Sequence, residues 1–322
     1  MLDKIKITGA FFVAFIMLVI GASYDKNDDS DIIIENISSS PELQFNEIYE
    51  AKKIKVNVQG EIKEMDMEEY LISVVAGEVY PSYNLEALKA QAVAARTYLV
   101  YKMERGGCSN GGDICTESAH CQAYKSNEKM LSGWGEKYDE YYNKIKNAVY
   151  ETKGEIVLYD NKPINALYHS SSVDKTEDCV AVFGGTYPYL KSVSSTVSTN
   201  NSEYKKEITF TKKEFLDKIK KSFNVDTDKI DIKIISYTAS GRVSTLKLGE
   251  KSVKATALRK CLGLRSTDFT FENEGDKITF IMKGFGHGVG LSQVGAQEMA
   301  EQGKTYKEIL THYYTDTDIG NI

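Results

Sequence analysis

The order of apolar and polar positions predicts a chain in which helices and strands are mixed. Residues 53–58 alternate between charged or polar and apolar side chains, which is typical of a half-buried strand, and Gly60 marks the turn that follows. Asp66, with Glu69 three residues later, has the pattern of a capping box. This pattern predicts a helix that begins after Asp66 and ends near Gly77.

A longer helix is predicted from Asn84, a residue type that suits an N-cap, to about Arg105, where two glycines follow. Its apolar positions recur every three or four residues, as in a buried helix face: Leu85, Leu88, Ala92, Ala95 and Leu99. Farther along, the patterns predict helices at 136–151, 212–223 and 292–302, strands at 154–159, 164–170 and 277–283, and a hairpin of 230–237 with 243–248.

The N-terminal residues predict a different kind of segment. Lys4 and Lys6 precede an uncharged, mostly apolar run, 7–24, which is near the roughly 20 residues that cross a bilayer. We interpret this run as a single transmembrane helix of a protein of the cell membrane, with the lysines inside and the body of the chain outside the cytoplasm. A cleaved signal peptide is the alternative, because small residues cluster at 21–23.

The predicted fold class is α+β, with two lobes flanking a cleft and one N-terminal transmembrane helix before them. Between 194 and 267 the composition shifts to a basic helix and a hairpin, which predicts a second, more β-rich lobe. The predicted organisation is a cytoplasmic tip at 1–6, an anchor at 7–24, a polar linker at 25–47, a first part of a catalytic lobe at 48–193, the second lobe at 194–267, and the C-terminal part of the catalytic lobe at 268–322.

Composition narrows the function without identifying it. Over 322 residues the chain is 42% hydrophobic and 27% charged, which is ordinary for a folded protein. The net charge of −6 argues against a nucleic-acid binder, since such proteins normally carry a concentrated basic face.

The main candidate for chemistry is a carboxylate at the break between the two predicted helices. Glu78 follows the apolar run 71–76 and stands three residues before Pro81. Apolar surroundings raise the pKa of a carboxyl group, which a general acid needs near neutral pH. We predict that Glu78 is a catalytic acid; a solvated glutamate at a helix end is the alternative.

The longer helix carries two candidate substrate-binding cations. Lys89 and Arg96 are seven residues apart, so both fall on nearly the same helix face and could meet an oxygen-rich substrate. A solvated basic face is the alternative. Arg96 lies in a small and apolar stretch, where a guanidinium is expected to meet a carboxylate or a ligand oxygen.

Two polar clusters are further candidates for a binding cleft. At the end of a predicted strand, Tyr168, His169 and Ser170 are predicted to bind sugar hydroxyls, with a purely structural cluster as the alternative. The glycine-rich stretch 284–290 leads into a predicted helix with Ser292 as its N-cap. His287, Ser292 and Gln293 are predicted to line the cleft, with a tight structural turn as the alternative.

The loop 108–121 contains three of the five cysteines and one of the four histidines. Cys115, His120 and Cys121 are the tightest set of ligands for a tetrahedral Zn²⁺, with Cys108, a carboxylate or water in the fourth position. A disulfide of Cys108 with Cys115 or with Cys121 is the alternative, because oxidation is the default outside the cytoplasm. We favour zinc in a structural role, because the predicted acid already supplies the chemistry.

Three stretches of the sequence carry a resemblance to a known family. They are GEVYPSYNLEALKAQAVAARTYLVYK, YHSSSVDKTEDCVAVFGGTYPYLKSV and GFGHGVGLSQVGAQEMAEQGKTYKEILTHYY. Together they resemble the stage II sporulation protein D family. The resemblance implies a membrane-anchored lytic transglycosylase that cuts peptidoglycan during engulfment of the forespore. It also implies that Glu78 is the catalytic acid and that Lys89, Arg96 and Tyr168 lie around a glycan-binding cleft.

The implied substrate is glycan strands from which a partner amidase, the stage II sporulation protein P, has removed the stem peptides. Other implied partners belong to the engulfment membrane complex. The implied reaction needs one acid, because the 6-hydroxyl of muramic acid is the nucleophile and the product ends in 1,6-anhydromuramic acid. Asp174 and Glu177 are the candidates if a second carboxylate is required. The alternatives are a zinc-dependent wall hydrolase and a non-catalytic wall-binding module that recruits an amidase.

Overall fold

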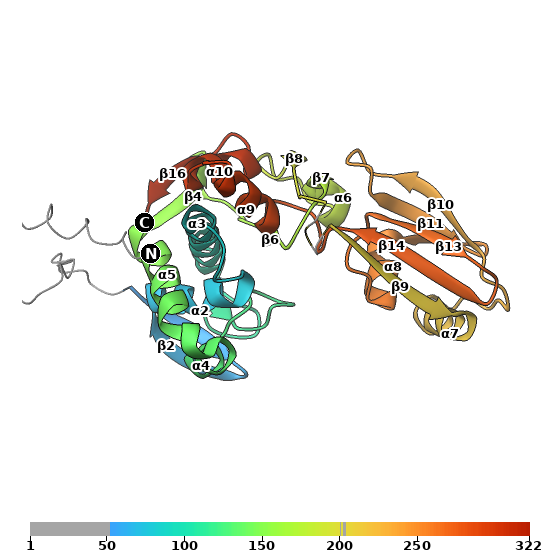
Figure 1. Ribbon diagram of the computed structural model, residues 1–322, viewed down its shortest axis with the longest axis horizontal. Coiled ribbons are helices and arrows are strands. Elements are labelled where there is room, and N and C mark those ends of the chain that lie inside the picture. The colour runs from blue at the N-terminus through green and yellow to red at the C-terminus, as the bar shows by residue number, and fades with distance from the viewer. Residues whose placement is uncertain (1–51, 200, 202–203) are drawn as a thin grey trace, which may run out of the picture. The chain divides into compact units, whose positions relative to one another are not determined.

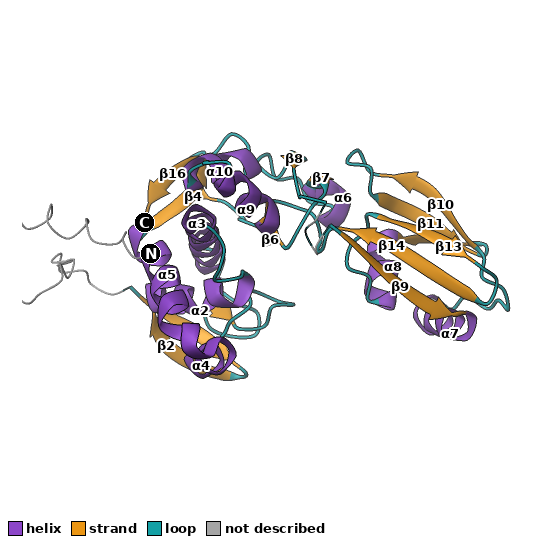
Figure 2. Ribbon diagram, viewed as in Figure 1, coloured by secondary structure: helices purple, strands orange, loops and turns teal. Residues whose placement is uncertain are grey.

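The computed structural model describes residues 52–199, 201 and 204–322. Helices are mixed with several small sheets, as the predicted α+β class requires (Figures 1 and 2). Most of the buried apolar side chains fall into three clusters, of which the first two share a helix.

The first cluster lies on a sheet of order β2-β1-β3. Its strands are β1 (Lys53–Val58), β2 (Glu61–Asp66) and β3 (Ile114–Cys115), and its helices are α2 (Met67–Glu78), α4 (Asn127–Trp134) and α5 (Tyr138–Glu151). Asp66 caps α2 by accepting from the backbone N–H groups of Glu68 and Glu69. The strand and helix predicted for this region are therefore confirmed.

Helix α3 (Leu85–Met103) is shared between the first and second clusters. The predicted stripe faces the first cluster, and small residues on the other side face the second: Ala87, Ala90, Val93 and Ala94. A helix that is buried nearly all round needs small or apolar side chains on every face, which explains the alanine-rich sequence. Asn84 caps α3 by accepting from the Glu86 N–H, as predicted.

The second cluster is covered by the sheet β16-β4-β5 and the parallel pair β15-β6. The strands are β4 (Glu155–Tyr159), β5 (Lys162–Pro163), β6 (Tyr168–His169), β15 (Leu291–Ser292) and β16 (Asp318–Asn321). The helices are α6 (Cys179–Phe183), α9 (Gln293–Glu301) and α10 (Tyr306–Tyr313). The β15-β6 pair brings together two polar clusters that are more than 100 residues apart in the chain.

The third cluster has two three-stranded sheets. They are β13-β14-β9, from β9 (Lys205–Thr211), β13 (Phe269–Asn273) and β14 (Lys277–Lys283), and β10-β11-β12, from β10 (Ile232–Tyr237), β11 (Val243–Leu248) and β12 (Lys251–Lys254). Helices α7 (Lys212–Phe223) and α8 (Ala255–Leu262) pack on them. Strands β13 and β14 share this core, although the sequence analysis assigns 268–322 to the catalytic lobe; the domain boundaries stay predictions.

In the part of the chain that the structure describes, no helix has both the length and the apolar character needed to cross a membrane. The longest, α3, carries four charged residues: Glu86, Lys89, Arg96 and Lys102. The predicted fold class is therefore corrected to a mixed α+β fold of several small sheets. The described residues support neither the predicted N-terminal transmembrane helix nor the predicted single-pass membrane location. The predicted anchor, 7–24, lies outside the described residues.

Candidate active site

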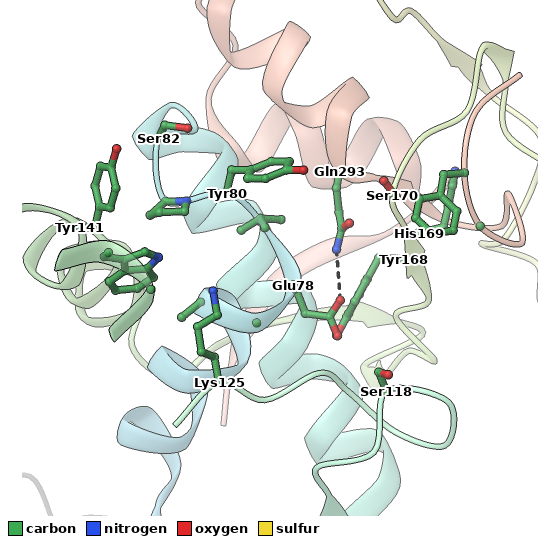
Figure 3. A pocket seen from close by; sticks show the side chains of 18 residues that line it. Glu78, Tyr80, Ser82, Ser118, Lys125, Tyr141, Tyr168, His169, Ser170 and Gln293 are labelled. Carbon is green, nitrogen blue, oxygen red and sulfur yellow. Dashed lines mark hydrogen bonds between the residues drawn. The ribbon is translucent and has the colours of Figure 1, made fainter. Parts of the chain in front are cut away.

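Glu78 is the last residue of α2 and lines a pocket of about 820 Å³. Gly77 stands before it, and a Cβ at this position would lie 3.0 Å from the backbone nitrogen of Tyr124. The glycine therefore allows the backbone of 123–124 to pass close to the end of α2. Figure 3 shows Lys125 and Tyr141 to one side of Glu78, Ser170 and His169 to the other, and Gln293 above the carboxyl group.

Three hydrogen-bond donors surround the Glu78 carboxyl group. Its Oε1 accepts from the Ala123 N–H at 2.6 Å and from the Tyr168 hydroxyl at 3.2 Å. Its Oε2 is 3.4 Å from Nε2 of Gln293. These groups stabilise the ionised form, and none of them accepts a proton from the carboxylic acid.

Burial raises the pKa of Glu78 above the usual value for a carboxyl group. The hydrogen bonds from Ala123, Tyr168 and Gln293 lower the pKa, but they offset the burial only in part. A carboxyl group with a raised pKa can keep its proton closer to neutral pH, which is the property expected of a general acid.

Gln122 orients the Tyr168 hydroxyl group that donates to Glu78. Gln122 is almost fully buried, and its Nε2 donates to the Tyr168 oxygen at 3.1 Å and to the Ala95 carbonyl at 3.2 Å. Its Oε1 accepts from the Tyr70 hydroxyl at 3.3 Å. The Tyr168 hydroxyl therefore accepts from Gln122 and donates to Glu78, so its direction is fixed.

Gln293 enters the pocket because β15 ends and α9 begins at this position. Its Nε2 also donates to Oε1 of the buried Gln91, at 3.3 Å. Ser292 is fully buried and does not line the pocket; its Oγ accepts from the N–H groups of Gly295 and Ser172, both at 3.2 Å. Ser292 thus caps α9, as predicted, and binds the segment that follows β6.

His169 lines the pocket and is fixed as one neutral tautomer. Its Nδ1 is 3.2 Å from the Val289 carbonyl, which can only accept, and its Nε2 is 2.5 Å from Oγ of Ser172. Ser172 in turn accepts from Nη2 of Arg242 at 2.8 Å, so its own proton points at His169. Burial lowers the pKa of His169 well below its usual range, and the charges of His287 and Arg242 lower it further.

His287 stands behind His169 and does not line the pocket, which differs from the prediction. Its ring lies 5.6 Å from the His169 ring and 5.4 Å from the Phe183 ring, measured between centroids. Its Nδ1 accepts from the Val289 N–H at 3.1 Å. The structure therefore brings Tyr168, His169, Ser170 and Gln293 to the pocket with Glu78, and leaves Ser292 and His287 as supports.

Lys89 and Arg96 are not at the pocket, although the sequence analysis predicts that both bind substrate. Nζ of Lys89 pairs with Glu86 at 2.9 Å and with Glu151 at 2.8 Å. Arg96 is fully buried and pairs with Glu68 at 2.5 Å. Seven-residue spacing does place them on one side of α3, but that side is covered by α5 and β4 and not by solvent.

The side chains of the loop 108–121 form a cluster that has the geometry of a metal site. One ligand atom from each of Cys108, Cys115, His120 and Cys121 lies within 4.8 Å of all the others. The three Sγ atoms are 3.3–3.4 Å from Nδ1 of His120. Three thiols and one imidazole around a point suit a tetrahedral Zn²⁺, so the chemistry of the donors fits the predicted ion.

The disulfide alternative does not match the cluster. Cys108 and Cys121 have their Sγ atoms 3.7 Å apart, and both thiols are free. A disulfide would bring the sulfurs to about 2.05 Å. Cys108 fills the fourth position that the sequence analysis leaves open, so four protein ligands face one another.

Sequence reasoning missed one side of the pocket. This side is formed by Lys125, Trp134 and Tyr141. Sequence reasoning also missed the backbone N–H of Ala123, which donates to Glu78. None of them lies in a motif that predicts sugar chemistry. The only available signal was position, since all follow the cysteine loop within some 20 residues.

The fold and the pocket define the general class: a mixed α+β protein with one carboxylic acid in a polar and aromatic pocket, beside a cluster of three thiols and an imidazole. A family model described as Stage II sporulation protein matches residues 56–159. Stage II sporulation protein D of Bacillus subtilis (strain 168) is 36% identical over 311 residues, which are 94% of this chain and 90% of the relative. The chain belongs to the stage II sporulation protein D family, as the resemblance predicts, and is a sporulation protein.

Two further relatives extend this comparison. Stage II sporulation protein D of Bacillus amyloliquefaciens is 40% identical over 260 residues, which cover 80% of this chain and 75% of that protein. A protein named Amidase enhancer, from Bacillus subtilis (strain 168), is 28% identical over 301 residues. That match covers 77% of this chain but 40% of the relative, so most of the longer relative lies outside the match.

Proposed function

We propose that this protein is a lytic transglycosylase that cleaves peptide-stripped peptidoglycan glycan strands during engulfment, with Glu78 as its single acid and base. The observation that carries the proposal is that Glu78 is the only carboxylate among the described residues that line the pocket. Ordinary glycosidases pair two carboxyl groups across the bond that they cut. A transglycosylase that uses a hydroxyl of its own substrate as nucleophile needs only one.

Neither of the other carboxylates considered from the sequence lines this pocket. Asp174 is exposed in β7 (Asp174–Lys175), which pairs with β8 (Ser194–Ser195). Glu177 is buried, and its Oε2 accepts from the hydroxyls of Thr238 and Ser240, both at 2.6 Å. These contacts support a structural role for Glu177 and leave the pocket with one acid.

The contacts of Glu78 suit both halves of the proposed reaction. As an acid with a raised pKa, Glu78 protonates the glycosidic oxygen, because its protein partners are donors and leave the proton for the substrate. The bond between C1 of muramic acid and this oxygen then breaks. The 6-hydroxyl oxygen of the same sugar bonds to C1, and its proton returns to the Glu78 carboxylate. No water is consumed, and the three donors stabilise the carboxylate between the two proton transfers.

Zinc has a structural role in this proposal. Bound by Cys108, Cys115, His120 and Cys121, it would cross-link the loop that runs directly into Gln122 and Ala123. Those two residues orient the donors around Glu78. A set of four protein ligands leaves no open position for a reactive water, which argues against the zinc-dependent hydrolase considered from the sequence.

The proposed partners are peptidoglycan glycan strands and the sporulation amidase, stage II sporulation protein P, which would remove stem peptides before cleavage. The relative named Amidase enhancer favours a second candidate, in which the protein binds the wall and recruits an amidase without cutting glycan. In that case Glu78 would have no chemical role.

The products of peptide-stripped wall glycan distinguish the two candidates. We expect fragments lighter by one water than hydrolysed ones, measured by mass spectrometry, because the end closes to a 1,6-anhydro ring. Glu78→Gln should keep its fold and bind glycan but release no fragments. Release of anhydro fragments by this variant at the normal rate would refute the role of Glu78, and the absence of any fragment from the unaltered protein would favour the recruiting module.

A further inference from the structure

Lys125 is the one lysine or arginine among the described residues that line the Glu78 pocket. The other basic residue on the pocket wall, His169, is held neutral by its contacts. Lys125 is only half-buried, and Figure 3 shows it on the same side of Glu78 as Tyr141. The pocket therefore presents one positive charge to whatever enters it.

No carboxylate of the protein neutralises Lys125 in the part of the chain that the structure describes. Lys89, by comparison, lies between two glutamates. Nζ of Lys125 instead lies 5.4 Å from the centroid of the Trp134 ring. A cation on an aromatic face keeps its charge and its hydrogen-bond donors, so Lys125 is available to an anionic ligand.

The backbone of Lys125 is held in place relative to the helix that ends in Glu78. Its backbone N–H donates to the Ser73 carbonyl of α2 at 3.0 Å, and Ala123, two residues earlier, donates to Glu78 itself. The residue after Lys125, Ser126, caps α4. The segment 123–125 both binds Glu78 and carries Lys125. One ligand could therefore contact the acid and the cation at the same time.

The proposed substrate carries one kind of charge. Its sugars are neutral except for the lactyl group of muramic acid, which ends in a carboxylate when no stem peptide is attached. When the stem peptide is present, the same carbon is a neutral amide. The aromatic rings of Trp134 and Tyr141 line the pocket next to Lys125 and suit the faces of sugar rings.

We infer that Lys125 is the residue that selects peptide-stripped strands, by binding the free lactyl carboxylate of a muramic acid in the Glu78 pocket. This inference rests on the proposed function, because it takes glycan as the ligand. A peptide-bearing strand loses the charged hydrogen bond to Nζ and leaves the lysine without an anion. The selectivity is therefore set by the ligand's charge, in addition to any effect of the size of the peptide.

The test uses binding, so that it does not depend on cleavage. In a Glu78→Gln background, calorimetry measures the dissociation constants of a peptide-stripped glycan hexasaccharide and of the same compound with its lactyl carboxylates converted to methylamides. The methylamide is neutral and small, so that it changes charge with little change in size. We expect the carboxylate form to bind about tenfold more tightly, as one partly exposed charged hydrogen bond would give.

Lys125→Met in the same background should remove this preference, so that both compounds bind as weakly as the methylamide bound before. Lys125→Arg should restore most of it, and Lys129→Met, an exposed lysine of α4 outside the pocket, should leave it unchanged. Raising the salt concentration should reduce the preference only where residue 125 is charged.

A tenfold preference that survives in the Lys125→Met variant overturns the inference, and so does equal binding of the two compounds to a protein with Lys125 intact. Cleavage is scored separately in the unaltered chain. If that chain forms no anhydro ends while the preference still depends on Lys125, the proposed reaction fails and the selecting residue stands. If neither compound binds, both fail.

Discussion

Replacing Arg96 with methionine is expected to cost stability and to leave glycan recognition intact in the molecules that fold. Arg96 binds Glu68 through Nε at 3.0 Å and through Nη2 at 2.5 Å. It also donates to the carbonyls of Glu155 and Val149, both at 3.1 Å. All of these contacts lie inside the protein, away from the pocket.

The size of the effect follows from burial. Glu68 is 1% exposed, so Arg96→Met leaves a carboxylate in the core without its partner. Breaking a buried ion pair from one side costs about 3–5 kcal/mol. The variant also loses the hydrogen bonds to two carbonyls, so we expect a loss of stability near the upper end of this range. For a unit of this size we expect the melting temperature to fall by roughly 10 °C.

The measurement is urea unfolding of Arg96→Met, with the double variant Glu68→Gln and Arg96→Met beside it. The double variant removes both charges and should recover more than half of the lost free energy of unfolding, because no ion remains buried alone. Lys89→Met is the matched control on the same helix; its partly exposed pairs should contribute about 0–1 kcal/mol. If Arg96→Met keeps its full stability and loses glycan binding, then Arg96 serves the substrate and this reasoning is wrong.

Three further predictions concern acidity, metal and packing. Cleavage should slow as pH rises through the raised pKa of Glu78, and Tyr168→Phe should move this decline to higher pH in a rate profile, because the lost hydrogen bond had lowered that pKa. Cys115→Ser should leave less than one zinc per chain by elemental analysis and lower the melting temperature by more than about 5 °C; unchanged stability would count against a structural metal. Gly295→Ala, whose Cβ would overlap a tyrosine hydroxyl of α10, should cost about 1–3 kcal/mol, whereas Gly133→Ala, in open space, should cost nothing; equal effects in thermal melts would contradict this packing argument.

Local sequence signals predicted the elements well where one residue type decides the geometry. Strands β1 and β14 and helix α7 begin and end where the patterns predict. Asn84 and Ser292 act as the predicted N-caps, because capping depends on a side chain and its own next few N–H groups.

Contacts between distant segments could not be predicted from spacing. Periodicity placed Lys89 and Arg96 on one helix face, but it gives no information about what covers that face. The sequence analysis expects Arg96 to meet either a carboxylate or a ligand oxygen. It meets a carboxylate, which belongs to Glu68 of the same protein. Lys125 was missed because nothing in its local pattern indicates that α4 and Glu78 border one pocket.

The contact of Arg242 with Ser172 has a practical consequence for any attempt to shorten this protein. Arg242 is brought by the strands of the third cluster, and Gly288 must lack a side chain because a Cβ there would lie 2.9 Å from the guanidinium carbon. A trimmed version that joined 201 directly to 284 would keep every residue of the pocket wall. It would still lose the donor that sets the direction of the Ser172 hydroxyl, so the hydrogen bond at Nε2 of His169 would no longer have a fixed direction, while the contact of Nδ1 with the Val289 carbonyl would remain.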